Sequence, residues 1–435
     1  MLKAKNKLGL VFFPAFDWAI SPTHPEREER LLYTKDQLFE EGIEDIEGIK
    51  MFNPDIASYK DIERVHFAVP NVEKRITKSH LVSIGGAIKA FDLYFSGEVD
   101  KSFALVRPPG HHAHRVVYGD RGFCIANVEA VALEHMREKY KDLRVAIVDT
   151  DCHHGDGTED IYYNDKNTLV ISLHQDGRTL YPGTGSMNEM GGPAAYGYNV
   201  NIPLPPGTGD EGFLYVLENV VMPILKDYKP DLIINSAGQD NHYSDPLTNM
   251  NFSAQGYAKL NEILNPNIAV LEGGYSIEDA LPYVNLGIIL AMAGMDYSQI
   301  REPNYSPTKV AQSREVTEYI KQISKAVMEG WNNKELLGQN KFKNIEIYEK
   351  PKQIYYDTDG IMENQTQYFK ICKKCSGLNH IISKSDSGFK IKAITIPRDA
   401  CKNCVDEGYK EYKKTESNYT NIYLQDRLND EYFQK

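Results

Sequence analysis

The sequence lacks any apolar run that approaches the roughly 20 residues of a membrane-spanning helix, which excludes a protein with helical membrane spans. Positive charge is in the minority, because 49 Lys and Arg stand against 61 Asp and Glu, for a net charge of −12. This balance argues against non-specific binding of nucleic acid or membrane surfaces by the protein as a whole. The sequence also contains no internal repeat and no low-complexity tract.

Cysteine is scarce, with six residues among 435. Four of them fall in two close pairs, which in a non-secreted chain indicates metal binding rather than disulfides. Residues 1–14 (MLKAKNKLGLVFFP) lack a small-residue cleavage site and are more typical of a first strand than of a signal peptide. We therefore expect a reducing compartment and a cytoplasmic location.

The length of 435 residues predicts two or three domains, and a hydrophobic fraction of 41% is typical of a soluble globular protein. In the first 300 residues, short β-branched runs alternate with helical stretches such as 126–140 and 212–226. This alternation predicts an α/β fold with a mostly parallel sheet. The expected strands are 102–107, 144–149, 168–174, 198–203, 231–236 and 267–271.

Nearly every expected strand runs directly into a loop rich in Gly, His and Asp. The five loops are RPPGHH, DTDCHHGDGT, SLH, SAGQD and LEGGY. Because the carboxyl ends of parallel strands form the ligand crevice of an open sheet, we expect these loops to converge. Five independent turns are the alternative, since Gly and Asp are common in turns, but His is not, and three of the loops contain it. The pattern therefore favours a single site.

The loop that follows strand 144–149 carries residues typical of a catalytic metal site. Asp151 and His153 lie two residues apart at a strand end and can point to one metal ion, and Asp240 in SAGQD is the best third ligand. Three protein ligands and one open position for water are typical of catalytic zinc. Two carboxylates with one imidazole suit zinc or ferrous iron, and the residue types do not separate the two.

Two further loops supply groups for the hydrolysis of an amide or ester. His111 and His112 can take a proton from a metal-activated water and return one to the leaving amine, because the imidazole pKa lies near neutrality. Asp149 and Asp156 can orient His111 and His112, respectively. The phenol of Tyr275, after the glycine pair of LEGGY, can stabilise an oxyanion.

Six motifs, in this order, resemble those of the histone deacetylase superfamily, which includes class II-type, acetoin-utilisation-like and acetylpolyamine amidohydrolase-like proteins. They are RPPGHHA, GFC-x-x-N (122–127), DxDxHHGDGT, SLH with YPGTG, SAGxD with DPL, and LEGGY, and the likeness covers residues 8–330. The resemblance implies an arginase/deacetylase-like α/β fold, with helices flanking a mostly parallel central sheet, and one catalytic zinc. The implied activity is zinc-dependent hydrolysis of acyl-lysine amides, with acetyl-lysine in a protein or a small molecule as the substrate.

The resemblance implies that Asp151, His153 and Asp240 are the zinc ligands. It implies that His111 and His112 are the acid–base pair and that Tyr275 polarises the substrate carbonyl. These are the residues that the residue types also suggest. The resemblance adds Phe123 and Tyr181 as aromatic walls of an acyl-lysine tunnel, with Gly122 at the rim. It also implies a structural potassium ion near the zinc loop. The matching potassium ligands are the side chains of Asp149 and Ser172 and the backbone carbonyls of Asp151 and His153.

Leu247, in the DPL motif, bears on the choice of substrate. The polyamine-specific relative has a glutamate here to hold a distant ammonium, whereas leucine suits an apolar rim and favours acyl-lysine. A deacetylase of acetylpolyamines or other small amides is the alternative. A non-catalytic acyl-lysine binding protein is less consistent with the complete set of chemical groups, and an arginase-like ureohydrolase is less consistent with DxDxHH.

The two cysteine pairs form a second candidate metal site. Cys372-x2-Cys375 and Cys401-x2-Cys404, with 25 residues between them, are the pattern of a four-cysteine structural zinc site. With the β-rich segment 389–396 between the pairs, they resemble a zinc ribbon. A unit of this size needs its metal in order to fold.

The composition changes beyond residue 331, and residues 366–415 carry 11 Lys and Arg against 5 Asp and Glu. This surplus allows nucleic acid or an acidic protein as a partner, whereas a structural or oligomerising role is the alternative. The expected organisation is a deacetylase domain (1–331), a linker or arm (332–367), a small four-Cys zinc-ribbon-like module (368–412) and a polar tail (413–435).

Overall fold

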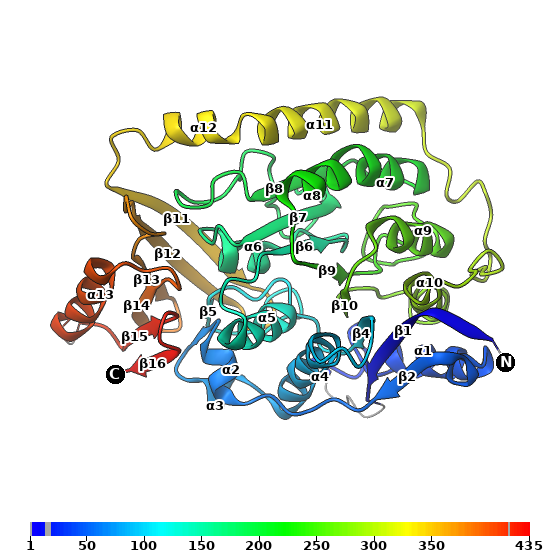
Figure 1. The fold of residues 1–435 in the computed structure, drawn as a ribbon, viewed down its shortest axis with the longest axis horizontal. Helices are drawn as coiled ribbons and strands as arrows, with labels where there is room; N and C mark the ends of the chain where they lie inside the picture. The colour runs from blue at the N-terminus through cyan, green and yellow to red at the C-terminus, as the bar shows by residue number, and fades with distance from the viewer. Residues whose placement is uncertain (1, 14–18, 416–417) are drawn as a thin grey trace.

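The computed structural model describes residues 2–13, 19–415 and 418–435. Within them, the main sheet has eight strands in the order β2-β1-β4-β10-β9-β6-β7-β8, and every neighbouring pair is parallel (Figure 1). The strands are β1 (Lys3–Phe12), β2 (Glu47–Phe52), β4 (Lys101–Leu105), β6 (Val145–Asp149), β7 (Thr168–Gln175), β8 (Asn199–Leu204), β9 (Leu232–Ala237) and β10 (Ile268–Leu271). The expected mostly parallel α/β sheet is confirmed. Of the expected first strand, Met1 and Pro14 lie outside the described residues.

Several interior strands of this sheet are buried along their whole length. All residues of β4, β6 and β10 are buried, and the runs of β6 and β10 are rich in Val, Ile and Leu. Such continuous apolar runs are typical of parallel strands covered on both faces. The helices that flank the sheet include α10 (Leu281–Ala293), which is apolar around most of its circumference and correspondingly buried.

The remaining helices of the first 332 residues connect these strands. Asn127 begins α5 by accepting a hydrogen bond from the N–H of Ala130, and Ser253 begins α9 in the same way through Gly256. The helices are α1 (Glu29–Glu40), α2 (Tyr59–Glu63), α3 (Val72–Arg75), α4 (Lys78–Phe95), α5 (Val128–Lys139), α6 (Asp156–Tyr162), α7 (Asp210–Val216), α8 (Met222–Tyr228), α9 (Ala254–Leu264) and α11 (Arg314–Asn332). Among the described residues, no helix is long and apolar enough to cross a membrane.

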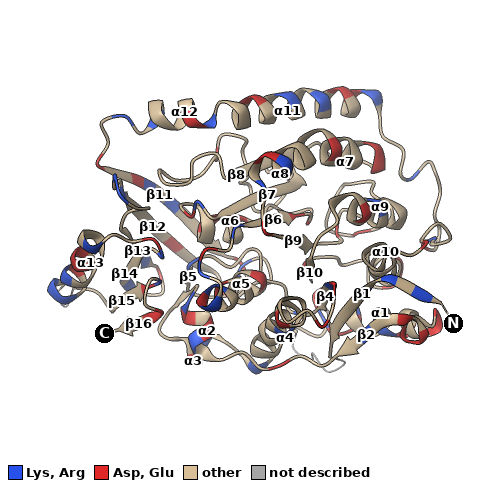
Figure 2. Cartoon of the chain, in the orientation of Figure 1, with Lys and Arg blue, Asp and Glu red and all other residues tan. Residues whose placement is uncertain are grey.

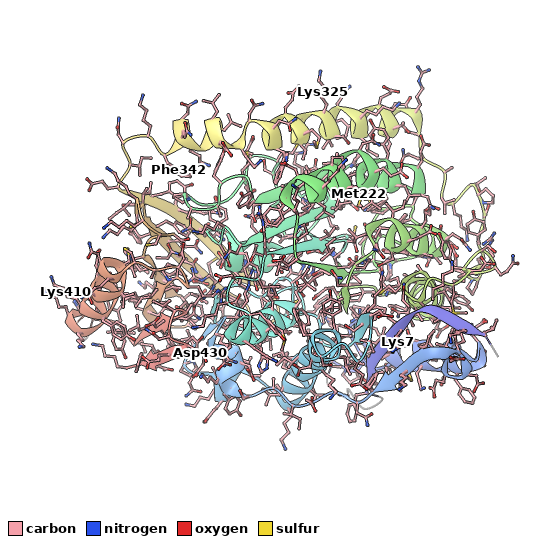
Figure 3. The ribbon with its side chains drawn as sticks, viewed as in Figure 1. Lys7, Met222, Lys325, Phe342, Lys410 and Asp430 are labelled. Carbon is pink, nitrogen blue, oxygen red and sulfur yellow. The ribbon has the colours of Figure 1, made fainter. Side chains whose placement is uncertain are left out.

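A second sheet follows the first domain, at the end of the molecule away from the N-terminus (Figure 1). Its neighbouring strands are antiparallel, except that β14 and β15 are parallel and are joined by α13 (Lys402–Lys414). The chain reaches it through α11 and α12 (Lys334–Lys341), and Lys325 points outward from α11 (Figure 3). In order, the strands are β11 (Ile347–Tyr356), β12 (Ile361–Lys370), β13 (Asn379–Ser385), β14 (Lys390–Ile396), β15 (Asn421–Asp426) and β16 (Glu431–Gln434).

This second sheet differs from what the sequence predicts for two segments. Residues 332–367, expected to be a linker, contain α12, β11 and most of β12, and residues 413–435, expected to be a polar tail, contain β15 and β16. The inward face of β12 is polar, with Glu363, Gln365 and Gln367 buried. β12 therefore lacks the apolar alternation by which a strand is recognised in a sequence.

The second sheet packs directly on the first domain through a shared apolar core. A short two-stranded sheet, β3 (Phe67–Ala68) with β5 (Val116–Val117), supplies the first domain's side of this core. At the far edge, Arg64 donates hydrogen bonds of 2.8 and 3.0 Å to the carboxylate of Asp430, the residue labelled near the C-terminus in Figure 3. The core residues are Phe67, Val69, Val116, Tyr118, Ile354, Tyr356, Ile381, Ile391, Ala393 and Tyr423.

The basic surplus of this region is interleaved with acidic residues. Lys410 points away from the molecule at its outer end (Figure 3), and α13 carries both blue and red segments in Figure 2. Asp406, Glu407 and Glu411 share this helix with its lysines. The positive charge is therefore not a single continuous patch on α13, and a nucleic-acid or acidic-protein partner stays a prediction.

Candidate active site and metal centres

Four motif loops meet at the carboxyl edge of the main sheet. The strands β4, β10, β9 and β6 are consecutive neighbours, and each is followed by one of the loops rich in Gly, His and Asp. The loops carry, in that order, the tandem histidines, the LEGGY tyrosine, Asp240 and the pair Asp151/His153. Residues up to about 160 positions apart along the chain are thereby brought into hydrogen-bonding contact, as with Gly110 and Glu272.

The first candidate metal-binding cluster consists of Asp151, His153 and Asp240, whose potential ligand atoms lie within 4.8 Å of one another. His153 Nδ1 lies 2.8 Å from Asp240 Oδ2 and 3.2 Å from Asp151 Oδ1. Burial lowers the pKa of His153, but the two carboxylates outweigh burial and raise it to about 10. Two fully buried carboxylates require a cation beside them, so this donor set fits a divalent metal ion such as zinc.

The tandem histidines each contact one carboxylate, with the pairing expected from the sequence. His111 Nδ1 lies 3.0 Å from Asp149 Oδ2, and His112 Nδ1 lies 2.9 Å from Asp156 Oδ1. The centroids of the two imidazole rings are 4.1 Å apart. These contacts leave the Nε2 atom of each ring available on the side away from its carboxylate.

The pKa values of the two histidines shift in opposite directions although the residues are neighbours. Burial lowers the pKa of His111, but the carboxylates of Asp151 and Asp149 outweigh it and hold this pKa well above its usual value. Burial and the positive charge of His111 together hold the pKa of His112 well below its usual value, against the pull of Asp156. The two pKa values are therefore displaced in opposite directions.

Asp156 accepts hydrogen bonds from more groups than the sequence analysis assigned to it. His114 Nε2 lies 3.1 Å from its Oδ2, and the guanidinium of Arg121 binds both oxygens at 2.7 and 3.1 Å. His114 Nδ1 in turn lies 3.5 Å from Asp160, which accepts a hydrogen bond of 2.6 Å from Lys352 of β11. The second sheet thus contacts the network behind His112.

Glu272 is a site residue whose role the sequence analysis missed, although it lies within the LEGGY motif. Its Oε2 accepts hydrogen bonds from the N–H groups of Gly110 (2.7 Å) and His111 (3.1 Å), which places the tandem-histidine loop. Burial and the neighbouring Glu129 hold the pKa of Glu272 well above its usual value. Glu129 lies inside α5 and accepts from Ser236 at 2.7 Å, so only the tertiary structure joins the two carboxyls.

Tyr275 lies buried beside the metal-binding cluster. Its backbone N–H donates to Asp245 at 2.7 Å, and its ring meets the Phe123 ring edge to face, with centroids 5.5 Å apart. Burial holds the pKa of the phenol well above its usual value, with the charges of Asp240 and Asp151 adding to the effect. The phenol therefore stays protonated and keeps its hydrogen-bond donor.

The residues expected to contact substrate are more exposed than the buried residues of the candidate site. Tyr181, which is 36% exposed, meets the His112 ring edge to face at 5.2 Å. Gly122 has a φ of +53°, and a Cβ added there would lie 2.5 Å from His112, so glycine is required. Leu247, 38% exposed, donates its backbone N–H to Asp245, which also accepts from the N–H of Tyr275. Asp149 and Ser172, the expected potassium ligands, are register partners on β6 and β7.

The four cysteines form the second candidate metal-binding cluster, with all four sulfurs within 4.8 Å of one another. Cys372 and Cys375 lie between β12 and β13, whereas Cys401 and Cys404 begin α13. The Sγ atoms of Cys372 and Cys401 are 3.8 Å apart, and those of Cys375 and Cys404 are 3.6 Å apart. Tetrahedral zinc–thiolate sites have sulfur–sulfur edges of about 3.8 Å, whereas a disulfide measures about 2.05 Å, so the arrangement fits zinc.

The backbone favours thiolate at Cys372, whereas burial raises the pKa of Cys375 and of Cys404. The N–H of Lys374 hydrogen-bonds Cys372 Sγ at 3.5 Å and is the main cause that lowers the pKa of this thiol to about 7. Thiolate is the form that binds metal, so the loop geometry supports the expected four-cysteine site.

These observations define an α/β protein with a mostly parallel sheet, whose carboxyl edge carries a buried Asp/His/Asp cluster that could hold a metal ion beside two histidines. Residues 68–288 match the family model of the histone deacetylase domain. A probable deacetylase of Archaeoglobus fulgidus is 45% identical over 323 residues, which cover 68% of this chain and 89% of that protein. The chain belongs to the histone deacetylase family.

Two further comparisons agree with this assignment. A histone deacetylase-like amidohydrolase of Pseudomonas aeruginosa is 34% identical over 241 residues, which cover 51% of this chain and 62% of that protein. The crystal structure of the HDA15 HD domain matches with a TM-score of 0.65 at 26% identity, covering 77% of this chain and 99% of that chain. The family model ends at residue 288, before α11 and the second sheet begin.

Proposed function

We propose that this protein is a zinc-dependent deacetylase that hydrolyses acyl-lysine amides. The family assignment and the names of its relatives support amide hydrolysis. The observation that carries the proposal is the Asp151/His153/Asp240 cluster, which faces two histidines that are each backed by a carboxylate. Zinc bound there would supply a Lewis acid that activates water and polarises the substrate carbonyl.

The two histidines would divide the proton transfers. His112 donates its Nδ1–H to Asp156 and stays neutral, so its Nε2 accepts the proton of the attacking water. His111, held protonated by Asp149 and Asp151, gives a proton to the leaving amine. The opposite shifts of their pKa values support this division of roles.

Tyr275 and the aromatic residues would act on the substrate. The protonated phenol of Tyr275 donates to the oxygen that becomes negative as the carbonyl is attacked. Phe123 and Tyr181, one in contact with Tyr275 and the other with His112, bound the approach to the acyl group and gain by burying the lysine stem. Gly122 leaves room at this approach, and Leu247 supplies an apolar contact outside it.

We further propose that a structural zinc ion is held by the four cysteines and that potassium binds beside Asp149. The sulfur–sulfur distances support the first proposal. The register pairing of Asp149 with Ser172, next to Asp151 and His153, supports the second.

The test compares variants that separate metal binding from chemistry. Asp240→Asn should lose the zinc of the first cluster and the activity together, whereas Tyr275→Phe should keep the zinc and lose about 10²–10³-fold in kcat. Tyr243→Phe, a nearby tyrosine whose hydroxyl bonds the carbonyl of Pro303, is the matched control. Zinc content and turnover of acetyl-lysine peptides and acetylated polyamines are the measurements.

Full activity in both Asp240→Asn and Tyr275→Phe would refute the assigned roles. Turnover of acetylated polyamines alone would favour the alternative of a small-amide deacetylase over acyl-lysine hydrolysis.

A further inference from the structure

The turn between β11 and β12 contacts two of the proposed substrate-contacting residues, Gly122 and Tyr181. Asp357 Oδ1 accepts hydrogen bonds from the N–H of Gly122 (2.9 Å) and from the hydroxyl of Tyr181 (3.3 Å). Asp359 Oδ2 accepts from the N–H of Asp120 at 2.6 Å. A segment some 235 residues further along the chain therefore borders the approach to His112.

The second sheet holds this turn in place. The strands β11 and β12 pair over ten consecutive positions up to the turn, and the hydroxyl of buried Tyr356 donates to the carbonyl of Val116 at 2.9 Å. The approach is close, since a Cβ added at Gly119 would lie 2.1 Å from Asp359 Oδ2. The carboxylate of Asp357 is thus positioned by the fold of the second sheet.

Asp357 presents its negative charge to solvent at this border. It is exposed, and the hydrogen bonds that it accepts from described residues all use Oδ1. Arg121, a cation that interacts with Asp357, is buried and binds both oxygens of Asp156, so its charge is compensated there. The outer side of the approach is therefore negative, and a cationic group arriving with a substrate is attracted to it.

We propose that Asp357 is a specificity-determining residue that selects acylated amines carrying a second, positively charged group beyond the acylated nitrogen. The inference rests on the proposed function and adds the substrate class. The recognised chemistry is an ammonium or guanidinium group outside the approach to the site. A basic residue that flanks acyl-lysine in a peptide and the free amine of an acetylated polyamine are the two sources of this chemistry.

The experiment measures kcat/KM for two matched substrate pairs with the full-length, zinc-loaded enzyme. One pair is an acetyl-lysine peptide followed by arginine and the same peptide with neutral citrulline. The other pair is a monoacetylated diamine and the N-alkyl acetamide of equal length. The wild type should prefer the cationic member, and Asp357→Asn should lower this preference about three- to fivefold, mainly through KM, because exposed ion pairs are worth about 1 kcal/mol or less.

Asp357→Asn retains an oxygen that accepts from Gly122 and Tyr181, so the loss isolates the charge. Asp406→Asn, on the exposed side of α13, removes an equal charge elsewhere and should leave the preference unchanged. Raising the salt concentration should weaken the preference of the wild type but not that of Asp357→Asn. The substrate pair that shows the effect identifies the source of the cation.

An unchanged preference in Asp357→Asn, or a wild type without any preference, would overturn this inference while leaving the proposed function intact. A wild type that hydrolyses none of the four amides would instead refute the proposed function, and with it this inference.

Discussion

Lys352 on β11 donates a hydrogen bond of 2.6 Å to Asp160 on α6, so a lysine of the second sheet neutralises a carboxylate buried in the first domain. Asp160 is fully buried, and it lies 3.5 Å from His114, which binds Asp156 behind His112. The second sheet is therefore connected by charge to the proposed acid–base pair, and not only by apolar packing.

Lys352→Met should destabilise the protein by about 3–5 kcal/mol, because it leaves the Asp160 carboxylate buried without its cation. Chemical denaturation measures this loss. Lys384→Met, an exposed lysine on β13, is the matched control and should have little effect. The double variant Lys352→Met/Asp160→Asn should recover part of the loss, and strict additivity of the two single changes would contradict the proposed pairing.

The two metal-binding clusters should be separable by zinc content. Cys404→Ser should lose the structural zinc and lower the thermal stability of the second sheet, while the zinc bound by Asp151, His153 and Asp240 is retained. Asp240→Asn should show the converse. Cys124→Ser, a buried cysteine outside both clusters, is the control and should retain all of the zinc. A Cys404→Ser variant with the same zinc content as the wild type would exclude the four-cysteine site.

Stability should fall in acid because His66 is buried in its neutral form. Its Nε2 accepts from the N–H of Asn127 and its Nδ1 lies 2.8 Å from the carbonyl of His114, and burial lowers its pKa to about 4. The unfolded chain binds this proton below about pH 6.5, so unfolding is favoured as the pH falls from 6.5 to 4. The contribution reaches about 3 kcal/mol at the lower limit.

Denaturation curves at several pH values test this prediction through His66→Gln, in which stability should depend less on pH across that range. His135 provides a control of opposite sign, because its hydrogen bond to Asp61 raises its pKa. That stabilisation is complete below pH 6.5 and is lost as the pH rises through the folded-state pKa. An identical pH dependence in the wild type and His66→Gln would contradict the prediction.

A variant truncated after Thr415 should fold poorly, because the truncation removes β15 and β16. Tyr423 and Leu424 of β15 are buried against the rest of the sheet, and Asp430 pairs with Arg64. Leu424→Ala alone should cost about 2–5 kcal/mol. Thermal unfolding and soluble yield are the measurements, and a truncated chain as stable as the full one would show that these residues are a tail after all.

The sequence predicted the proposed metal ligands because they follow strands that are themselves easy to recognise. The apolar runs at 145–149 and 232–237 identify β6 and β9, and Asp151, His153 and Asp240 occupy the loops directly after them. The partners of His111 and His112 could also be inferred, because Asp149 and Asp156 are the carboxylates left over in the same loop. The order of the six motifs along the sequence indicated the family.

Several contributors to the site had no such signal. Glu129 lies in the first turn of a helix outside the motif loops, and its contact with Glu272 depends on how α5 packs on the sheet. Lys352 and Asp357 fall in a polar segment that resembles a linker, because β12 buries mainly polar side chains and Lys352 pairs with a carboxylate across the interface. Pattern-based interpretation looks for apolar periodicity and cannot detect such strands.

By itself, the sequence determined the parallel α/β fold, the family and the residue types of both metal clusters, since local apolar runs and short motifs specify these features. Only the tertiary structure decided that the C-terminal region is a six-stranded sheet and that its β11–β12 turn borders the proposed active site. The physical reason is that these contacts join polar groups distant along the chain, and their partners become identifiable only once both sheets have formed.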